Sequence, residues 1–141
     1  KIIEEIYEEH KELCWVDTDI VFTKNPLFHI QNREKVLFQT DKPSGSLICS
    51  GFMVFNTTKK CEELIEVCSG YDDQDDQLLI NHVAPTFFPE DFEILDPRYF
   101  PNGQVYYDLG IKENAVIVHN NWMVGIETKI NKFKNEGLWH V

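Results

Sequence analysis

The stretch CWVDTDIVF, residues 14–22, places two aspartates inside a run that is otherwise apolar. Apolar residues on both sides of Asp17 and Asp19 predict a buried strand, which would be more stable without the acids. A carboxylate buried without a partner costs several kcal/mol, and two neighbouring carboxylates repel each other. The pair therefore requires a compensating cation, so the fold must bring that cation and its further ligands to this point.

The spacing of the two acids is that of a shared ligand site. On an extended chain Asp17 and Asp19 project to the same face, while Thr18 points away. Of the five histidines, His119 is the best third ligand, because it follows the β-branched run at 116–118. Two carboxylates and an imidazole suit a divalent ion such as Mn²⁺, with open positions for water or phosphate oxygens. A chance aspartate pair and a hydrogen-bonded histidine at the rim of the core are the structural alternatives.

Composition and charge indicate one globular domain, residues 1–141, that does not bind nucleic acid. At 43% hydrophobic residues, the chain can build a core. A net charge of −11, with 13 basic against 24 acidic residues, argues against contact with a phosphate backbone. No stretch approaches the roughly 20 apolar residues of a membrane span, so the chain is expected to be soluble. It opens on Lys1 in mid-pattern, which predicts a fragment of a longer protein.

Strand and helix patterns alternate along the chain. The alternation indicates a mixed α/β domain with a largely parallel sheet, in which ligands gather at the carboxyl ends of strands. Gly51 lies inside a predicted strand, where glycine marks either a bulge or a close approach to the backbone. Apolar spacing predicts helices over 2–13, 58–70, 72–83 and 126–139 and strands over 13–16, 35–40, 47–56, 92–96 and 115–119.

Four segments in a fixed order carry a family resemblance. CWVDTDIVFTKNPL, SGFMVFNTT, DDQLLINH and VIVHNNWMVGIETKINKFKNEGLW together resemble the nucleotide-diphospho-sugar transferases of the glycosyltransferase A fold. The resemblance covers nearly the whole chain. It implies a Rossmann-like α/β domain, with a mixed, mostly parallel sheet flanked by helices. In that fold the base and ribose are held upstream of the Asp-x-Asp strand, so part of the amino-terminal nucleotide-binding half is expected to be missing.

The resemblance also implies roles for individual residues. The implied metal ligands are Asp17, Asp19 and His119, holding Mn²⁺ or Mg²⁺. The implied donor-binding residues are Thr18, then Ser50 and Gly51 where the donor sugar lies against the backbone, Asp75 near the sugar hydroxyls, and Lys129 at the diphosphate. The implied catalytic residues are Asp76 and Gln77, near the anomeric carbon.

The implied activity is metal-dependent transfer of a sugar from a nucleotide-diphosphate donor, typically a UDP-sugar, with retention of the anomeric configuration. The acceptor would be a glycan, a protein or a small molecule. It would bind at Trp122 or at the aromatic loop, unless these rings simply fill the core. The loop rings are Tyr99, Phe100, Tyr106 and Tyr107.

Two other functions stay open, namely a non-catalytic or truncated binding module and a metal-dependent nucleotidyltransferase. The sequence lacks a glycine-rich phosphate loop, which counts against the nucleotidyltransferase. The parent protein would be either cytoplasmic or a Golgi-lumen enzyme.

Overall fold

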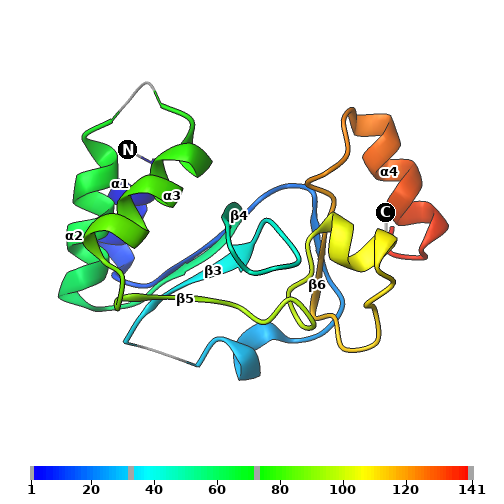
Figure 1. Ribbon diagram of the computed structural model, residues 1–141, viewed down its shortest axis with the longest axis horizontal. Helices are drawn as coiled ribbons and strands as arrows, with labels where there is room; N and C mark the ends of the chain where they lie inside the picture. Colours follow the sequence, from blue (N-terminus) through cyan, green and yellow to red (C-terminus); the bar gives the residue numbers. More distant parts are fainter. Residues whose placement is uncertain (1, 32–33, 72–73, 140–141) are drawn as a thin grey trace.

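The computed structural model describes residues 2–31, 34–71 and 74–139. Its α-helices are α1 (Ile2–His10), α2 (Lys59–Ser69), α3 (Asp76–Phe87) and α4 (Ile126–Asn135). Its strands are β1 (Leu13–Val16), β2 (Ile20–Phe22), β3 (Val36–Thr40), β4 (Ile48–Phe55), β5 (Phe92–Ile94) and β6 (Ile117–His119). Helices α1, α2 and α3 lie together at one end of the molecule and α4 at the other, with the strands between them (Figure 1). None of the helices in the described ranges is long and apolar enough to cross a bilayer.

The strands form a mixed sheet and a separate two-stranded ribbon. The larger sheet has the order β1-β4-β3-β5, and the ribbon joins β2 to β6. The expected mixed α/β architecture with flanking helices is confirmed, but the directions of the pairs differ from expectation. Only β3 and β5 run parallel among the described strand pairs, and the other three pairs are antiparallel. The turn at 41–47 returns the chain directly from β3 to β4, whereas α2 and α3 intervene before the parallel strand β5.

The expected continuous strand around the two aspartates is instead two strands joined by a tight turn. Strand β1 ends at Val16 in the larger sheet, and β2 begins at Ile20 in the ribbon. The amide of Ile20 donates to the carbonyl of Asp17 over 3.2 Å and closes the turn. The extended geometry predicted for Asp17 and Asp19 is therefore wrong, because the chain must change direction here to enter the second sheet.

Helix α2 follows its sequence signals. The hydroxyl of Thr58 accepts a hydrogen bond from the amide of Cys61 at 3.2 Å and caps the first turn. Cys61, Leu64 and Ile65 are buried, as the i, i+3, i+4 spacing predicts. The neighbouring helix was expected over 72–83; its first two positions lie outside the described residues, and α3 runs on to Phe87.

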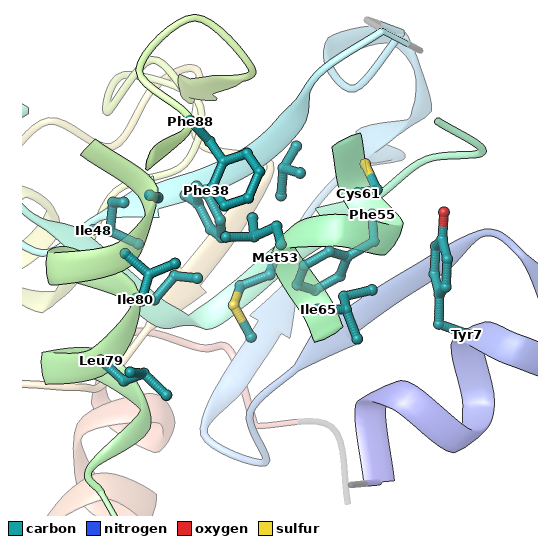
Figure 2. Packing of buried hydrophobic residues seen from close by; sticks show 14 residues of the cluster. Tyr7, Phe38, Ile48, Met53, Phe55, Cys61, Ile65, Leu79, Ile80 and Phe88 are labelled. Atoms are coloured by element: carbon teal, nitrogen blue, oxygen red, sulfur yellow. The ribbon is translucent and has the colours of Figure 1, made fainter. Parts of the chain in front are cut away.

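The main apolar core lies between the three-helix end and the larger sheet (Figure 2). Phe38 from β3 and Met53 and Phe55 from β4 pack against side chains of α2 and α3. A second cluster, which includes Leu37, Phe52 and Phe100, fills the space between the sheet and the ribbon. Strand β4 is therefore buried on both faces, which explains its nearly continuous apolar sequence.

The pairing of β3 with β4 contains a break that shapes the functional site. Phe38 pairs with Met53, but the next residue, Gln39, pairs with Cys49, so the β3 ladder steps over residues 50–52. On the other side of β4, the carbonyl of Gly51 accepts from the amide of Asp17 at 2.8 Å. The break thus places Gly51 against the aspartate turn, at the point where the two sheets diverge.

Candidate functional site

Asp17, Asp19 and His119 converge, although their positions span most of the chain. Ile20 pairs with His119 in the ribbon, which brings the end of β6 beside the aspartate turn. The imidazole Nε2 lies 3.3 Å from Oδ1 of Asp19 and 3.9 Å from Oδ2 of Asp17. One ligand atom from each of the three residues lies within 4.8 Å of the others. We call these three residues the acid triad.

The hydrogen bonds of Gln39 determine which imidazole nitrogen of His119 carries the proton. The amide Nε2 of Gln39 donates to the carbonyls of Phe100, at 3.2 Å, and Pro101, at 2.9 Å. Its Oε1 must therefore face Nδ1 of His119, at 2.8 Å, and accept a proton from it. In the neutral ring this leaves the lone pair of Nε2 directed toward the two aspartates, the orientation that a metal-binding histidine requires.

Gly51 makes room for the acid triad. A Cβ atom at this position would clash with the imidazole of His119 and would lie 2.8 Å from Oδ2 of Asp17. The expected close approach to the strand backbone is therefore real, and the groups that approach are two side chains of the triad. No larger residue fits at position 51 without displacing them.

Asp19 is shared between His119 and Lys129. While its Oδ1 faces the imidazole, its Oδ2 accepts from Nζ of Lys129 at 2.5 Å. The interaction with His119, followed by the Lys129 ammonium, holds the pKa of Asp19 well below its usual range, against the opposing effect of burial. Because Nδ1 already carries a proton, the Nε2–Oδ1 contact is satisfied only by a second proton on the ring or by a cation between the two atoms.

An open cavity of about 880 Å³ adjoins the acid triad. Asp17, Thr18, Asp19 and Lys129 provide its polar wall, so the structure brings four of the predicted site residues to one space. Thr18 is exposed at this wall, rather than turned away as an extended chain would require. The remaining lining residues are Trp15, Val16, Met123, Val124, Gly125, Ile126, Ile130, Phe133 and Trp139.

The other predicted residues lie on the α3 side of β4. The amide of Ser50 donates to Oε1 of Gln77 at 3.4 Å, a long contact that joins β4 to the helix. Asp75 caps α3, since its Oδ1 accepts from the amide of Leu78 at 2.9 Å. Asp76 is exposed and, with Ser50, lines a second cavity of about 540 Å³. The structure thus separates the acid triad and Lys129 from Asp75, Asp76 and Gln77, with Ser50 and Gly51 between the two groups.

Sequence reasoning missed Gln39, Asp41, Asn81 and Asn121. Asn81 anchors α3, because its side chain bonds both the amide and the carbonyl of Ile48, each at 2.8 Å. Asn121 donates to Asp41 at 2.8 Å. The available signal was the run QTD at the end of the apolar strand VLF, the same pattern of polar residues at a strand end that identified Asp17.

The aromatic residues considered for the acceptor separate into core and surface. Phe100 and Tyr106 are buried, as the alternative interpretation predicted. The hydroxyl of Tyr107 donates to Oδ1 of Asn120 at 2.5 Å. Trp122 is 53% exposed and lines a third hollow of about 650 Å³, whose other lining residues are Lys42, Pro43, Ser44, Gln104 and Asp108.

Comparison with known proteins places the chain among sugar transferases. A UDP-galactose:fucoside alpha-3-galactosyltransferase of Dictyostelium discoideum is 22% identical over 99% of this chain. The UDP-D-xylose:L-fucose alpha-1,3-D-xylosyltransferase MGP4 of Arabidopsis thaliana is 26% identical over 97% of the chain. The chain spans 27% of the length of the first relative and 47% of the second.

Structure comparison supports the same assignment at the level of the fold. A glycosyltransferase involved in the glycosylation of the major capsid of PBCV-1 superposes with a TM-score of 0.65 at 17% identity, over 91% of this chain and 70% of that one. The model of the nucleotide-diphospho-sugar transferase family matches residues 1–133. The resemblance in the four sequence segments is thereby confirmed, and this chain belongs to the nucleotide-diphospho-sugar transferase family.

Proposed function

We propose that this chain forms the metal-binding and sugar-binding part of a glycosyltransferase that uses a nucleotide-diphosphate sugar. The observation that carries the proposal is the convergence of Asp17, Asp19 and the lone pair of His119 Nε2. Family membership and the names of the relatives support the class of reaction. Because the chain spans less than half the length of those relatives, the activity is assigned to the parent protein.

The donor set of the acid triad fits Mn²⁺, with Mg²⁺ as the alternative. Asp17, Asp19 and Nε2 of His119 would hold the ion, and the orientation set by Gln39 leaves the imidazole ready to bind it. When bound, the metal would neutralise the diphosphate of the donor and stabilise the negative charge that develops on it as the sugar leaves. A chain with a net charge of −11 has particular need of such an ion to admit an anionic donor.

The residues around the triad have roles that follow from their positions. Lys129 places a positive charge beside Asp19, where it can also contact a diphosphate oxygen. Gly51 leaves room on β4 for His119 and Asp17, and we place the donor sugar next to it, at Ser50, which lines the cavity on the α3 side. Asp76 and Gln77, on the other side of Ser50, would face the reacting carbon and stabilise its developing positive charge. We propose that transfer proceeds with retention of the anomeric configuration.

For the donor and acceptor, the relatives suggest specific chemistry. Their names specify UDP-galactose or UDP-D-xylose as donor and a fucoside or L-fucose as acceptor. We propose a UDP-sugar donor and a glycan acceptor for the parent of this chain. The exposed indole of Trp122, beside the polar side chains of Lys42 and Gln104, is a suitable platform for the C–H face of an acceptor sugar.

Calorimetry on the parent protein tests the metal-dependent donor site. Wild-type protein should bind UDP in the presence of Mn²⁺, and Asp19→Asn should abolish this binding, because it removes a ligand charge from the triad. Asp91→Asn is the control. Asp91 is also half-buried, but its backbone carbonyl accepts from the amide of Val36, at the end of β3 away from the triad. Undiminished Mn²⁺-dependent binding by the Asp19 variant would contradict the proposal.

Product analysis tests the transfer itself. A UDP-sugar with a fucose-terminated acceptor and Mn²⁺ should yield a new glycoside, and the proton coupling constant at its anomeric carbon reports retention or inversion. Binding without any transfer or donor hydrolysis would favour the non-catalytic alternative. Pyrophosphate released from a nucleoside triphosphate would instead favour nucleotidyl transfer.

A further inference from the structure

Asp41 is a buried carboxylate outside the acid triad. It follows the last residue of β3 and is only 9% exposed. Its Oδ1 accepts from Nδ2 of Asn121 at 2.8 Å, and its Oδ2 accepts from Nε2 of Gln77 at 3.3 Å. Within residues 2–31, 34–71 and 74–139, no ion pair involves this carboxylate. Burial accordingly raises the pKa of Asp41.

Both oxygens of a carboxylate at position 41 accept hydrogen bonds. An asparagine of the same shape would present an NH₂ group on one side. With aspartate, the NH₂ groups of Gln77 and Asn121 must both point toward position 41. Burying this charge costs stability, and what the protein gains in return is a fixed orientation of the two side-chain amides. We call Asp41, Gln77 and Asn121 the amide cluster.

The far end of each amide meets an N–H group that matches this orientation. Oε1 of Gln77 accepts from the amide of Ser50 at 3.4 Å, and Oδ1 of Asn121 accepts from the amide of Gly103 at 3.0 Å. Rotating either side-chain amide by half a turn would place its NH₂ group against the backbone N–H of Ser50 or Gly103, so that two donors would face each other. The amide cluster therefore has one consistent arrangement, which extends from α3 to the loop after β6.

The orientation of Gln77 leaves one of its hydrogens unused. Of the two hydrogens on Nε2, one is donated to Asp41, and the other has no partner among the described residues. Gln77 is half-buried and bonded to Ser50, whose neighbour Gly51 contacts the triad. The unused N–H therefore belongs to a group that is fixed in place on the α3 side of β4, beside the strand residue that precedes Gly51.

We propose that Asp41 is a positioning residue for sugar transfer, which locks the amide of Gln77 so that its remaining N–H is offered to the donor sugar. This inference rests on the proposed function. Asp41 itself is not required to touch the substrate, because it acts through Gln77. The arrangement supplies a preorganised hydrogen-bond donor that does not have to rotate into place during the reaction.

Asp41→Asn is the sharpest test, since it keeps the shape and reverses one hydrogen-bonding group. One neighbouring amide must turn over, and we expect it to be that of Gln77, because its contacts with Asp41 at 3.3 Å and with Ser50 at 3.4 Å are longer than those of Asn121 with Asp41 and Gly103. We expect kcat of the parent enzyme to fall on the order of 10–100-fold, with little change in Mn²⁺ affinity. Asp91→Asn should leave kcat unchanged. An Asp41→Asn enzyme with wild-type kcat would overturn the proposal.

A double-mutant cycle with Gln77→Ala separates positioning from a general structural role. If Asp41 acts through Gln77, then Asp41→Asn should lower kcat no further in the Gln77→Ala background. Independent, multiplying losses would overturn the proposal. Asp41→Ala, which introduces no reversed amide, enters the same cycle if Asp41→Asn does not fold.

A readout that needs no activity distinguishes failure of this inference from failure of the proposed function. In parent protein labelled with ¹⁵N at the glutamine side chains, the NH₂ resonance of Gln77 should shift strongly in Asp41→Asn and stay in place in Asp91→Asn. An unmoved resonance would overturn the orienting role of Asp41. A wild-type parent that transfers no sugar would instead contradict the proposed function, while the resonance would still decide whether Asp41 orients Gln77.

Discussion

The acid triad and the amide cluster are two polar regions close together, yet they satisfy their hydrogen bonds in opposite ways. In the triad, Nε2 of His119 faces the oxygens of Asp17 and Asp19 while the proton of the neutral ring is held on Nδ1, so this contact lacks a proton or cation of its own. In the cluster, both oxygens of Asp41 receive an N–H from within the protein. The triad therefore needs a second ring proton or a cation to complete its contacts, whereas both oxygens of Asp41 are satisfied within the protein and only one N–H of Gln77 is left over.

The pKa values of Asp19 in the triad and Asp41 in the cluster are shifted in opposite directions. His119 and Lys129 hold the pKa of Asp19 well below its usual range. Burial raises the pKa of Asp41, because two neutral amides compensate a charge less well than an ammonium does. The triad thus contains a carboxylate whose negative charge its surroundings stabilise, and the cluster contains one whose charge burial disfavours.

The largest effect is expected from Gly51→Ala, which should break the triad and spare the cluster. The added methyl group would displace His119 and Asp17, so Mn²⁺ affinity should fall by more than about 100-fold. Isothermal titration with Mn²⁺ measures the loss. The NH₂ resonances of Gln77 and Asn121 should change little, and Mn²⁺ affinity close to that of wild type would refute the steric account.

Gln39→Leu should produce the next largest effect. Without the Oε1 contact the imidazole loses its fixed tautomer, and Mn²⁺ affinity should fall about 10–100-fold. Leu64→Ala is the control for general destabilisation, since it should cost about 2–5 kcal/mol of unfolding free energy without changing Mn²⁺ affinity. Equal losses of metal binding in both variants would show that Gln39 is only structural.

Lys129→Met should change metal and donor binding in opposite directions. Removing the ammonium from Asp19 frees negative charge for the cation, so Mn²⁺ affinity should rise about 2- to 5-fold. UDP binding at saturating Mn²⁺ should weaken, because the diphosphate loses a positive neighbour. Lys134→Met, at the last turn of the same helix, should change neither value. Weaker binding of both ligands would contradict a role at the diphosphate.

The smallest effect is expected in the pH dependence of unfolding, where the two regions should differ in sign. The raised pKa of Asp41 means that its ionisation costs stability above that pKa, and the cost is relieved as pH falls toward 3.8, the ordinary value. The lowered pKa of Asp19 gives stability at neutral pH that is lost only below its ordinary value. The free energy of unfolding, measured in urea, should therefore rise for wild type relative to Asp41→Asn as the pH is lowered from about 7 to about 4. The difference from Asp19→Asn should stay constant in that range, and parallel curves for all three proteins would show that the pKa shifts are absent.

The polar residues at strand ends were predictable because they conflict with their surroundings. Asp17 and Asp19 interrupt an apolar run, and His119 ends one, so their energetic cost is visible in the local sequence alone. Gly51 was predictable for the same reason, as a glycine where a buried strand prefers larger side chains. Helix α2 was predictable from its Thr58 cap and apolar spacing, both of which are local signals.

The sequence by itself therefore determined which groups must be compensated, since burial of charge and apolar periodicity are properties of short segments. Only the tertiary structure decided how they are compensated. The turn between β1 and β2, the break in the β3–β4 pairing and the contacts of Gln39 and Asp41 join segments far apart in the chain. A hydrogen bond between such segments depends on register and side-chain orientation, which a local pattern does not encode.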